Sequence, residues 1–300
     1  MKIAILSGGT GLERDVALRS AKTFKDNIRY DNDLYILPEQ LDDFLASYKS
    51  YDLAIPVFHG KYGEDGIIFG LLESLSIKAA FSPMKTHAIC MDKNMTNILV
   101  NEIGIKIPKS YILKDIYDIA DIDITYPAIV KPNSGGSSIA TYKTENITEL
   151  EDAVKNVFEL TEDFALVQEF IIGTEYSVPI IGNAETEILP IMRVQLKSGD
   201  FFDHDEKYNS DGSNEIFGDT DKDLEFSLKQ KTKDIYRFLG CRGISRIDYM
   251  VNESGIYFLE VNTIPGFSAA SIFPKAWKLS GRDLPELIDL IISLGLEDNK

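Results

Sequence analysis

Short apolar runs that end in glycine-containing loops recur through the first part of the chain. Residues 3–6 and 53–58 are such runs, and amphipathic helical patterns follow them over about 12–24 and 67–75. This order of strand, loop and helix is typical of a parallel sheet whose functional loops lie at the carboxyl ends of its strands. We therefore expect a first α/β domain over residues 1–82.

The middle of the chain contains both helical and strand periodicities. Helical patterns cover residues 92–103 and 148–161, and strand patterns cover residues 126–131 and 165–170. This mixture indicates an α+β unit, which we place at residues 83–171.

The remaining residues, 172–300, contain several strand patterns, a lysine-rich helix over about 222–239 and a C-terminal helix over about 284–294. Gly240 follows the lysine-rich helix as a predicted C-terminal cap, because glycine adopts the left-handed conformation without strain. The predicted fold class is α/β with α+β units, in three domains.

Alternating polar and apolar residues predict a hairpin formed by residues 245–251 and 256–262. Glu253-Ser254-Gly255 fits a three-residue loop with glycine in the left-handed position. The resulting register pairs Asn252 with Ile256, Asp248 with Glu260, and Arg246 with Asn262.

One predicted face of this hairpin is acidic, with Phe258, Glu260 and Asn262 on it opposite Arg246 and Asp248. Two facing carboxylates repel each other, whereas oxygen atoms gathered on one surface suit Mg²⁺. An ordinary solvated face, with Arg246 neutralising the acids, is the alternative. The pattern alone leaves both interpretations open.

The charge balance and the residue counts exclude some classes of binding partner and of metal site. The 31 basic and 48 acidic residues give a net charge of −17, which argues against general nucleic-acid or anionic-membrane binding. The two cysteines are far apart and the three histidines are scattered, so any metal should be a hard cation held by oxygen. No secretory signal or membrane-spanning run is found, and we expect a cytoplasmic protein.

A glycine-rich loop, residues 133–138, follows Lys131 and could wrap a phosphate with its backbone N–H groups. A plain connecting turn is the alternative. Neither GxGxxG nor GxxxxGK[ST] occurs in the chain. The long polar stretch 204–214 predicts a loop, either a lid over a site or a solvent-exposed linker.

Taken in order, these segments resemble the D-alanine–D-alanine ligases of the ATP-grasp superfamily, which implies a three-domain ATP-grasp architecture. The similarity covers nearly the whole chain. Each motif alone is modest, but seven in the right order are specific. They are GGTGLERDVALRS (8–20), FHGKYGEDG (58–66), MDKNMTN (91–97), YPAIVKPNSGGSSIA (126–140), EKYNSD (206–211), GISRIDYM (243–250) and FLEVNTIPGFSAASIFP (258–274).

The resemblance implies that ATP is a co-substrate. Asp248, Glu260 and Asn262 would hold two Mg²⁺ ions, or Mn²⁺ in their place, on the ATP phosphates. This agrees with the face derived from strand alternation. The residues that would meet the nucleotide are Lys93, Lys131, Gly135, Gly136 and Ser138 at the phosphates, and Gln168, Phe170, Ile171, Glu175 and Phe201 around the adenosine.

The first D-alanine would lie at the N-terminal domain. Glu13 would hold its ammonium group and form a hydrogen-bonded triad with Ser137 and Tyr208 that steadies the lid. His59 would lie near its carboxylate.

The second D-alanine would lie beside Lys207 and Ser271, which would receive its carboxylate, and Ile272 would contact it through its side chain. The first carboxylate would attack the γ-phosphate, and the second amine would attack the acyl phosphate so formed. Arg246 and the Gly266 N–H would stabilise the resulting oxyanion. The dipeptide would serve peptidoglycan precursor synthesis.

The chain departs from the family pattern at five places. Gly11 and Ala17 stand where serines are usual, and Gln168 replaces a glutamate that accepts from the adenine amino group. Residues 216–219 lack the usual proline-alanine pair, and segment 25–52 is shorter than typical.

Three alternative functions compete with this one. A sister ligase would make a depsipeptide or another D-alanyl dipeptide, but Tyr208 favours the dipeptide, since a histidine there would favour D-lactate. A nucleotide-binding protein without ligase activity would have lost a metal ligand or Arg246. A dinucleotide-dependent oxidoreductase is disfavoured by the missing fingerprint. The resemblance also allows a homodimer.

Overall fold

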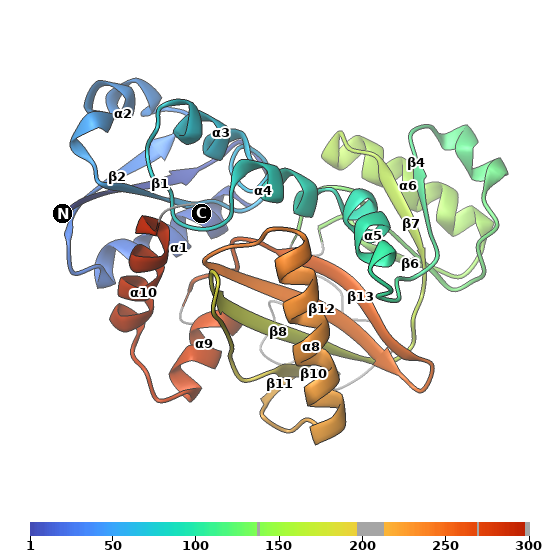
Figure 1. The fold of residues 1–300 in the computed structure, drawn as a ribbon. Coiled ribbons are helices and arrows are strands. Elements are labelled where there is room, and N and C mark those ends of the chain that lie inside the picture. Colours follow the sequence, from blue (N-terminus) through green and yellow to red (C-terminus); the bar gives the residue numbers. More distant parts are fainter. Residues whose placement is uncertain (137–138, 197–212, 269, 298–300) are drawn as a thin grey trace.

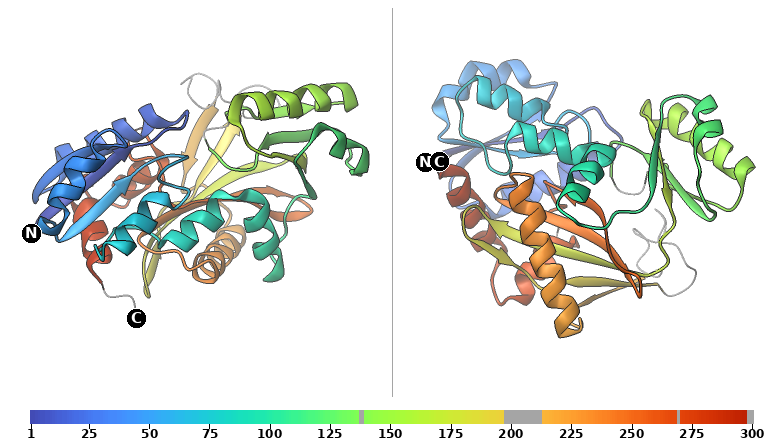
Figure 2. Two further views of the ribbon diagram at one scale, coloured as in Figure 1. Left: turned by 90° about the horizontal axis from the view of Figure 1, so that it is seen from above. Right: turned by 45° about the vertical axis from the view of Figure 1, so that its right-hand side comes forward.

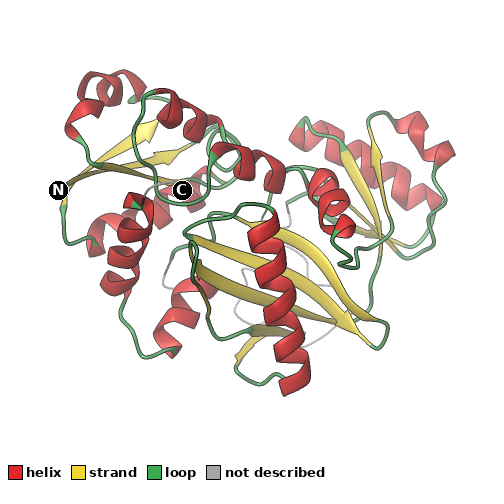
Figure 3. Cartoon of the chain, viewed as in Figure 1, coloured by secondary structure: helices red, strands yellow, loops and turns green. Residues whose placement is uncertain are grey.

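In the computed structural model, residues 1–136, 139–196, 213–268 and 270–297 are described, and they form three β-sheets (Figure 1). Figure 3 shows helices packed beside each sheet. Within these ranges no helix is both long enough and apolar enough to cross a lipid bilayer.

The N-terminal sheet is parallel, in the order β2-β1-β3, which confirms the predicted parallel arrangement. Strands β1 and β3 are built mostly from apolar residues and are almost entirely buried, whereas β2 starts with Asp31, Asn32 and Asp33 and is more exposed. The elements of this region are β1 (Lys2–Gly8), α1 (Arg14–Asn27), β2 (Asp31–Leu37), α2 (Leu41–Ser47), η1 (Tyr48–Ser50), β3 (Leu53–Val57) and α3 (Ile67–Ser74).

Of the last two helices, α10 (Leu284–Leu296) packs against β3 and α1, and α9 (Ile272–Leu279) packs against α10 and strand β8 of the largest sheet (Figure 1). They share one hydrophobic core with the N-terminal sheet, in which Phe24 of α1 stacks on Phe267 with ring centroids 4.1 Å apart. The proposed boundary at residue 82 stays a prediction. The shared core means that the end of the chain completes the packing of its beginning.

The middle sheet is antiparallel, in the order β4-β7-β5-β6, and has its own core beneath α6. Figure 2 shows it set apart from the other two sheets. Two helices connect it to the N-terminal region. The elements are α4 (Met84–Met91), α5 (Lys93–Glu102), β4 (Ser110–Leu113), η2 (Ile116–Asp121), β5 (Ala128–Pro132), β6 (Tyr142–Thr144), α6 (Ile147–Thr161) and β7 (Ala165–Glu169).

The largest sheet is antiparallel, in the order β11-β10-β8-β12-β13, with β9 paired to β8. Helix α8 (Lys222–Phe238) covers one face, and Gly240 follows it at φ 69°, as predicted for the cap. The strands are β8 (Thr174–Gly182), β9 (Thr186–Ile188), β10 (Met192–Leu196), β11 (Ser213–Phe217), β12 (Ile244–Asn252) and β13 (Gly255–Asn262).

The β12–β13 hairpin confirms part of the predicted register. Asp248 pairs with Glu260, and Arg246 pairs with Asn262. The three-residue loop is wrong, because Asn252 pairs with Gly255 and only two residues connect the strands.

An irregularity between Asp248 and Tyr249 restores the register, with Leu259 as the extra residue of β13. The bulge turns Phe258 away from the acidic face on which alternation had placed it. Phe258 is fully buried beside Tyr249, their ring centroids 6.5 Å apart. Burial of a large aromatic side chain outweighs strict alternation here.

The shared core predicts that Ile288 of α10, which is fully buried, supports the N-terminal sheet. Replacing Ile288 with alanine should lower the free energy of unfolding by about 2–5 kcal/mol, because the removed atoms leave a cavity. Urea denaturation measures this. Leu279→Ala, at a position that is 61% exposed, is the matched control and should stay within about 0.5 kcal/mol of the parent. Equal midpoints for both variants would refute the shared core.

Candidate active site

A cavity of about 450 Å³ lies where the N-terminal loops, the glycine-rich loop and the largest sheet meet. It is lined by residues that are far apart in the chain, including most of the predicted site residues that the structure describes. These are Glu13, His59, Lys93, Gly135, Gly136, Glu175, Arg246, Glu260, Asn262, Gly266, Ser271 and Ile272.

Asp248 was predicted as a metal ligand but does not line the cavity itself: it is only 3% exposed and lies behind the lining residues Arg246 and Asn262, to which it is hydrogen-bonded. Arg246 donates to it through Nε, at 2.9 and 3.1 Å, and through a terminal nitrogen at 2.8 Å. Ser177 of β8 donates to it at 2.6 Å. Burial lowers the pKa of Arg246, but Asp248, Glu260 and Glu175 outweigh burial and raise it, so the guanidinium stays charged.

Asn262 lies between the two acids. Its Nδ2 is 3.1 Å from Asp248 Oδ2 and 3.4 Å from Glu260 Oε1. The amide oxygen and nitrogen exchange places by a half-turn, so either atom can face the acids. No group of three His, Cys, Asp or Glu ligands occurs in the described part of the chain. A metal here would rest on two carboxylates and this amide, which are oxygen donors that suit a hard cation.

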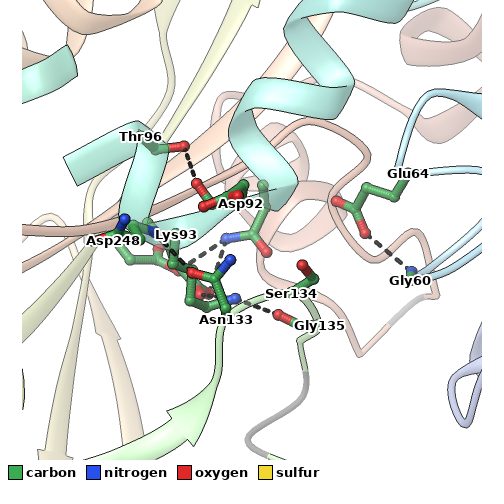
Figure 4. A network of polar contacts seen from close by, with 12 residues as sticks. Gly60, Glu64, Asp92, Lys93, Thr96, Asn133, Ser134, Gly135 and Asp248 are labelled. Atoms are coloured by element: carbon green, nitrogen blue, oxygen red, sulfur yellow. Dashed lines mark hydrogen bonds and ion pairs between the residues drawn. The ribbon is translucent and has the colours of Figure 1, made fainter. Parts of the chain in front are cut away.

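Lys93 connects the acids to the glycine-rich loop (Figure 4). Asp92 caps helix α5 by accepting from Met95 N at 2.8 Å, which places Lys93 at the first position of the helix. The Lys93 ammonium donates to the Gly135 carbonyl and lies 3.5 Å from Glu260 Oε2. The backbone N–H of Asn94 donates to Asn133 Oδ1 at 2.9 Å and anchors the start of the loop.

Four of the predicted ATP residues do not line this cavity: Lys131, Gln168, Phe170 and Ile171. They come from β5, and from β7 and the residues after it, in the middle sheet. Gln168 is buried and its Nε2 donates to Ser110 Oγ at 2.9 Å, so the amide nitrogen is already used. Their contact with a nucleotide stays a prediction.

Glu13 lies immediately before α1 and is 8% exposed. Glycine in the loops around it leaves room for the carboxylate, since a Cβ at Gly60 would lie 2.8 Å from Glu13 Oε2, and a Cβ at Gly136 would lie 3.0 Å from Oε1. A side chain at either position would push the carboxylate from its present place.

His59 is buried, and its Nε2 is 3.0 Å from Ser20 Oγ. Burial, together with the charges of Arg246 and Arg19, lowers the pKa of His59 to about 4. The ring is therefore neutral at pH 7. Any attraction to a substrate carboxylate there must come from hydrogen bonding or from Arg19, which lines the same cavity.

Glu64 was not predicted as a site residue, although it lies within the motif of residues 58–66. It lines the cavity and accepts from Gly60 N at 3.2 Å (Figure 4). Burial, with added repulsion from Glu13, raises the pKa of Glu64 to about 8. Ser177 was also missed, although it lies two residues after Glu175 and so on the same face of β8.

Five predicted residues lie outside the described residues, namely Ser137, Ser138, Phe201, Lys207 and Tyr208. The same holds for most of the proposed lid, up to residue 212. Among the departures, a Cβ at Gly11 would lie 3.5 Å from Lys61 N, which is an ordinary contact, so a serine would fit there.

An antiparallel sheet with facing acids, opposed across a cavity by a glycine-rich loop on a second sheet, is the architecture of the ATP-grasp enzymes. The C-terminal model of the D-ala D-ala ligase family matches residues 109–293. D-alanine–D-alanine ligase B of Clostridium perfringens is 32% identical over 99% of this chain and 98% of its own length.

Solved structures support the same family. The D-alanine–D-alanine ligase of Bacillus anthracis complexed with ATP superposes with a TM-score of 0.85 at 30% identity, over 99% of this chain and 97% of that one. The VanG D-Ala:D-Ser ligase of Enterococcus faecalis superposes with a TM-score of 0.81 at 30% identity, over 98% and 99%. The chain belongs to the D-alanine–D-alanine ligase family.

A pH effect on stability follows from His87, which is fully buried and stacks on Phe69. Burial lowers the pKa of His87 to about 3, so the unfolded chain takes up a proton below about pH 6.5 that the folded chain refuses. The stabilisation is complete above pH 6.5 and is lost as the pH falls toward 3.

In His87→Gln, the decline of the unfolding free energy between pH 6.5 and 4.5 should be shallower, by up to about 1.4 kcal/mol per pH unit. Urea midpoints at several pH values give this slope. Parallel slopes for the parent and variant would contradict the assignment of a neutral buried imidazole.

Proposed function

We propose that this chain joins two D-alanine molecules into D-alanyl-D-alanine at the expense of ATP, for peptidoglycan precursors. The observation that carries the proposal is that one cavity connects Glu13 to Arg246 and to Glu260, which pairs with the buried Asp248 on the neighbouring strand. An ammonium site, an oxyanion site and a phosphate site then lie within reach of one pair of substrates. The names and the ATP-bound structure of its relatives support the same conclusion.

In the first step, the carboxylate of one D-alanine attacks the γ-phosphate in line. Glu13 holds the ammonium group, and the helix α1 that begins after it sets the position of the carboxylate. The Lys93 ammonium donates to the glycine-rich loop at Gly135 and so lies where that loop would wrap the phosphates. From there its positive charge offsets charge on the phosphate oxygens. The product is an acyl phosphate and ADP.

In the second step, the deprotonated amine of the second D-alanine attacks the acyl carbon, and phosphate leaves. Arg246 and the Gly266 N–H stabilise the oxyanion, each contributing on the order of 3–4 kcal/mol in such sites. Ser271 is close to this point, because a Cβ on Gly266 would lie 3.0 Å from Ser271 Oγ. Ser271 is thus placed to receive the second carboxylate.

Asp248, Glu260 and Asn262 would hold Mg²⁺, which supplies charge neutralisation on the phosphate oxygens when bound. Their oxygen donors and their mutual approach support this assignment. Glu260 has the Asn262 amide at 3.4 Å and the Lys93 ammonium at 3.5 Å among its neighbours.

The cellular setting follows from the substrates. ATP is made inside cells, and the enzyme would work in the cytoplasm. Assembly into a homodimer stays a prediction that light scattering of the purified chain can test.

The alternative acceptor is D-serine, because one structural relative is a D-Ala:D-Ser ligase of comparable similarity. Among the described residues, Ser271 and Ile272 line the second subsite in both proposals. D-Lactate is the third acceptor to compare, and Tyr208 is expected to disfavour it.

The decisive assay measures ADP and phosphate release on adding D-alanine, L-alanine, or D-alanine together with D-serine or D-lactate. Mass spectrometry identifies the product. We expect release with D-alanine and a product of two alanyl residues, with L-alanine as the inactive control. A mixed product in preference to the alanine dipeptide would move the chain to the sister activity. No release with any D-amino acid would refute ligase function.

Replacing Glu260 with glutamine should lower the rate of ADP release at least about 100-fold at low Mg²⁺, because the amide keeps only one oxygen donor and has no negative charge for the cation. Thermal unfolding should show an intact fold. The matched control is Glu253→Gln at the exposed tip of the same hairpin, which should retain full activity. Near-normal activity of Glu260→Gln at low Mg²⁺ would contradict the metal assignment.

A further inference from the structure

The segment between β13 and α9 carries Gly266, and its first part lines the cavity at Ile264 together with His59 and Glu64 of the loop after β3. Within that loop, Glu64 accepts from Gly60 N at 3.2 Å.

The electrostatics agree with this proximity. Burial dominates in both groups, raising the pKa of Glu64 and lowering that of His59, and contact with the Ile264 backbone opposes burial in each case. The Ile264 backbone therefore lies against side chains from the loop after β3.

The other end of the segment is held at Phe267. Its N–H donates to Ser20 Oγ at 3.3 Å, and Ser20 Oγ is 3.0 Å from His59 Nε2. The Phe267 ring stacks on Phe24 of the same helix α1, with centroids 4.1 Å apart. Ser20 is 1% exposed, so little water competes for these bonds.

Only Pro265 and Gly266 lie between the two anchored residues. Proline restricts its own φ, and Gly266 is confined on one side by Ser271 Oγ, which a Cβ would approach to 3.0 Å. The direction of the Gly266 N–H is thus set by the two ends of residues 264–267. Stabilisation of an oxyanion depends on such a donor being aimed before the reaction.

We propose that Glu64, His59 and Ser20 are positioning residues that hold residues 264–267 so that the Gly266 N–H faces the tetrahedral intermediate. This rests on the proposed ligase function. These residues then act on the second step, because Lys93 and the acid pair serve the phosphoryl transfer from another part of the cavity. They also couple the oxyanion donor to the loop at Gly60, which borders Glu13 and the first substrate.

Two rates separate the steps. Dipeptide formation reports the whole reaction, and positional isotope exchange in ATP labelled at the β,γ-bridge oxygen reports reversible acyl-phosphate formation alone. Glu64→Ala should lower dipeptide formation about 10–100-fold, as expected for a displaced donor, and the ratio of exchange to dipeptide formation should rise about tenfold or more. Glu64→Gln keeps one acceptor oxygen and should fall between the parent and Glu64→Ala.

The matched control for Glu64 is Glu73→Gln, since Glu73 likewise accepts a backbone N–H, that of Met84 at 2.9 Å, but lies outside this cavity. Ser20→Ala provides a second variant if Glu64→Ala does not fold. Its control is Ser7→Ala, another buried serine, whose Oγ has no partner among the described residues. Both control variants should keep the parental ratio, and Ser20→Ala should raise it at least about threefold.

A folded Glu64→Ala or Ser20→Ala variant in which exchange and dipeptide formation fall equally would overturn the proposal, because the residue would then serve the first step or the structure in general. Parental rates in both assays would overturn it as well. Absence of exchange and of dipeptide in the parent protein would instead refute the proposed function.

Discussion

The repulsion between Asp248 and Glu260 is the constraint around which the site is built. Strand pairing places the two acids directly opposite each other. The Arg246 guanidinium and the Ser177 hydroxyl donate hydrogen bonds to Asp248, and the Lys93 ammonium lies beside Glu260, so these groups offset the repulsion. Each of these groups comes from a different strand or helix. The acid pair can therefore form only when the largest sheet is complete and α5 is docked against it, which ties the phosphate site to the fold.

On the other side of the cavity, around Glu13, the arrangement depends on glycines, which have no side chains. Glu13 keeps its place because Gly60 and Gly136 offer no Cβ to displace its carboxylate. One glycine belongs to the N-terminal domain and the other to the middle one, so the carboxylate lies where two loops approach each other. Burial keeps the nearby His59 neutral at pH 7 and raises the pKa of Glu64 to about 8.

The three sheets are not three independent units. Helices α9 and α10 end the chain on the core that includes the N-terminal sheet, and Phe267 is hydrogen-bonded to Ser20 of α1. The segment that leaves β13 thus crosses from the largest sheet to the N-terminal region. Connecting loops are commonly mobile, whereas this one is held at Phe267 by packing on Phe24 and by that hydrogen bond.

The sequence by itself determined the parallel N-terminal sheet, the cap at Gly240 and the pairing of Asp248 with Glu260, because these follow from local periodicity and glycine chemistry. Ordered motifs likewise identified the family. Only the tertiary structure decided the bulge at Leu259, since the gain from burying Phe258 depends on the core beneath the sheet. It also decided the surroundings of Glu64 and Ser20, whose neighbours Ile264 and Phe267 lie about 200 residues or more away in the chain. Such contacts leave no periodic signal, because nothing in the neighbouring residues records which distant backbone group a side chain will meet.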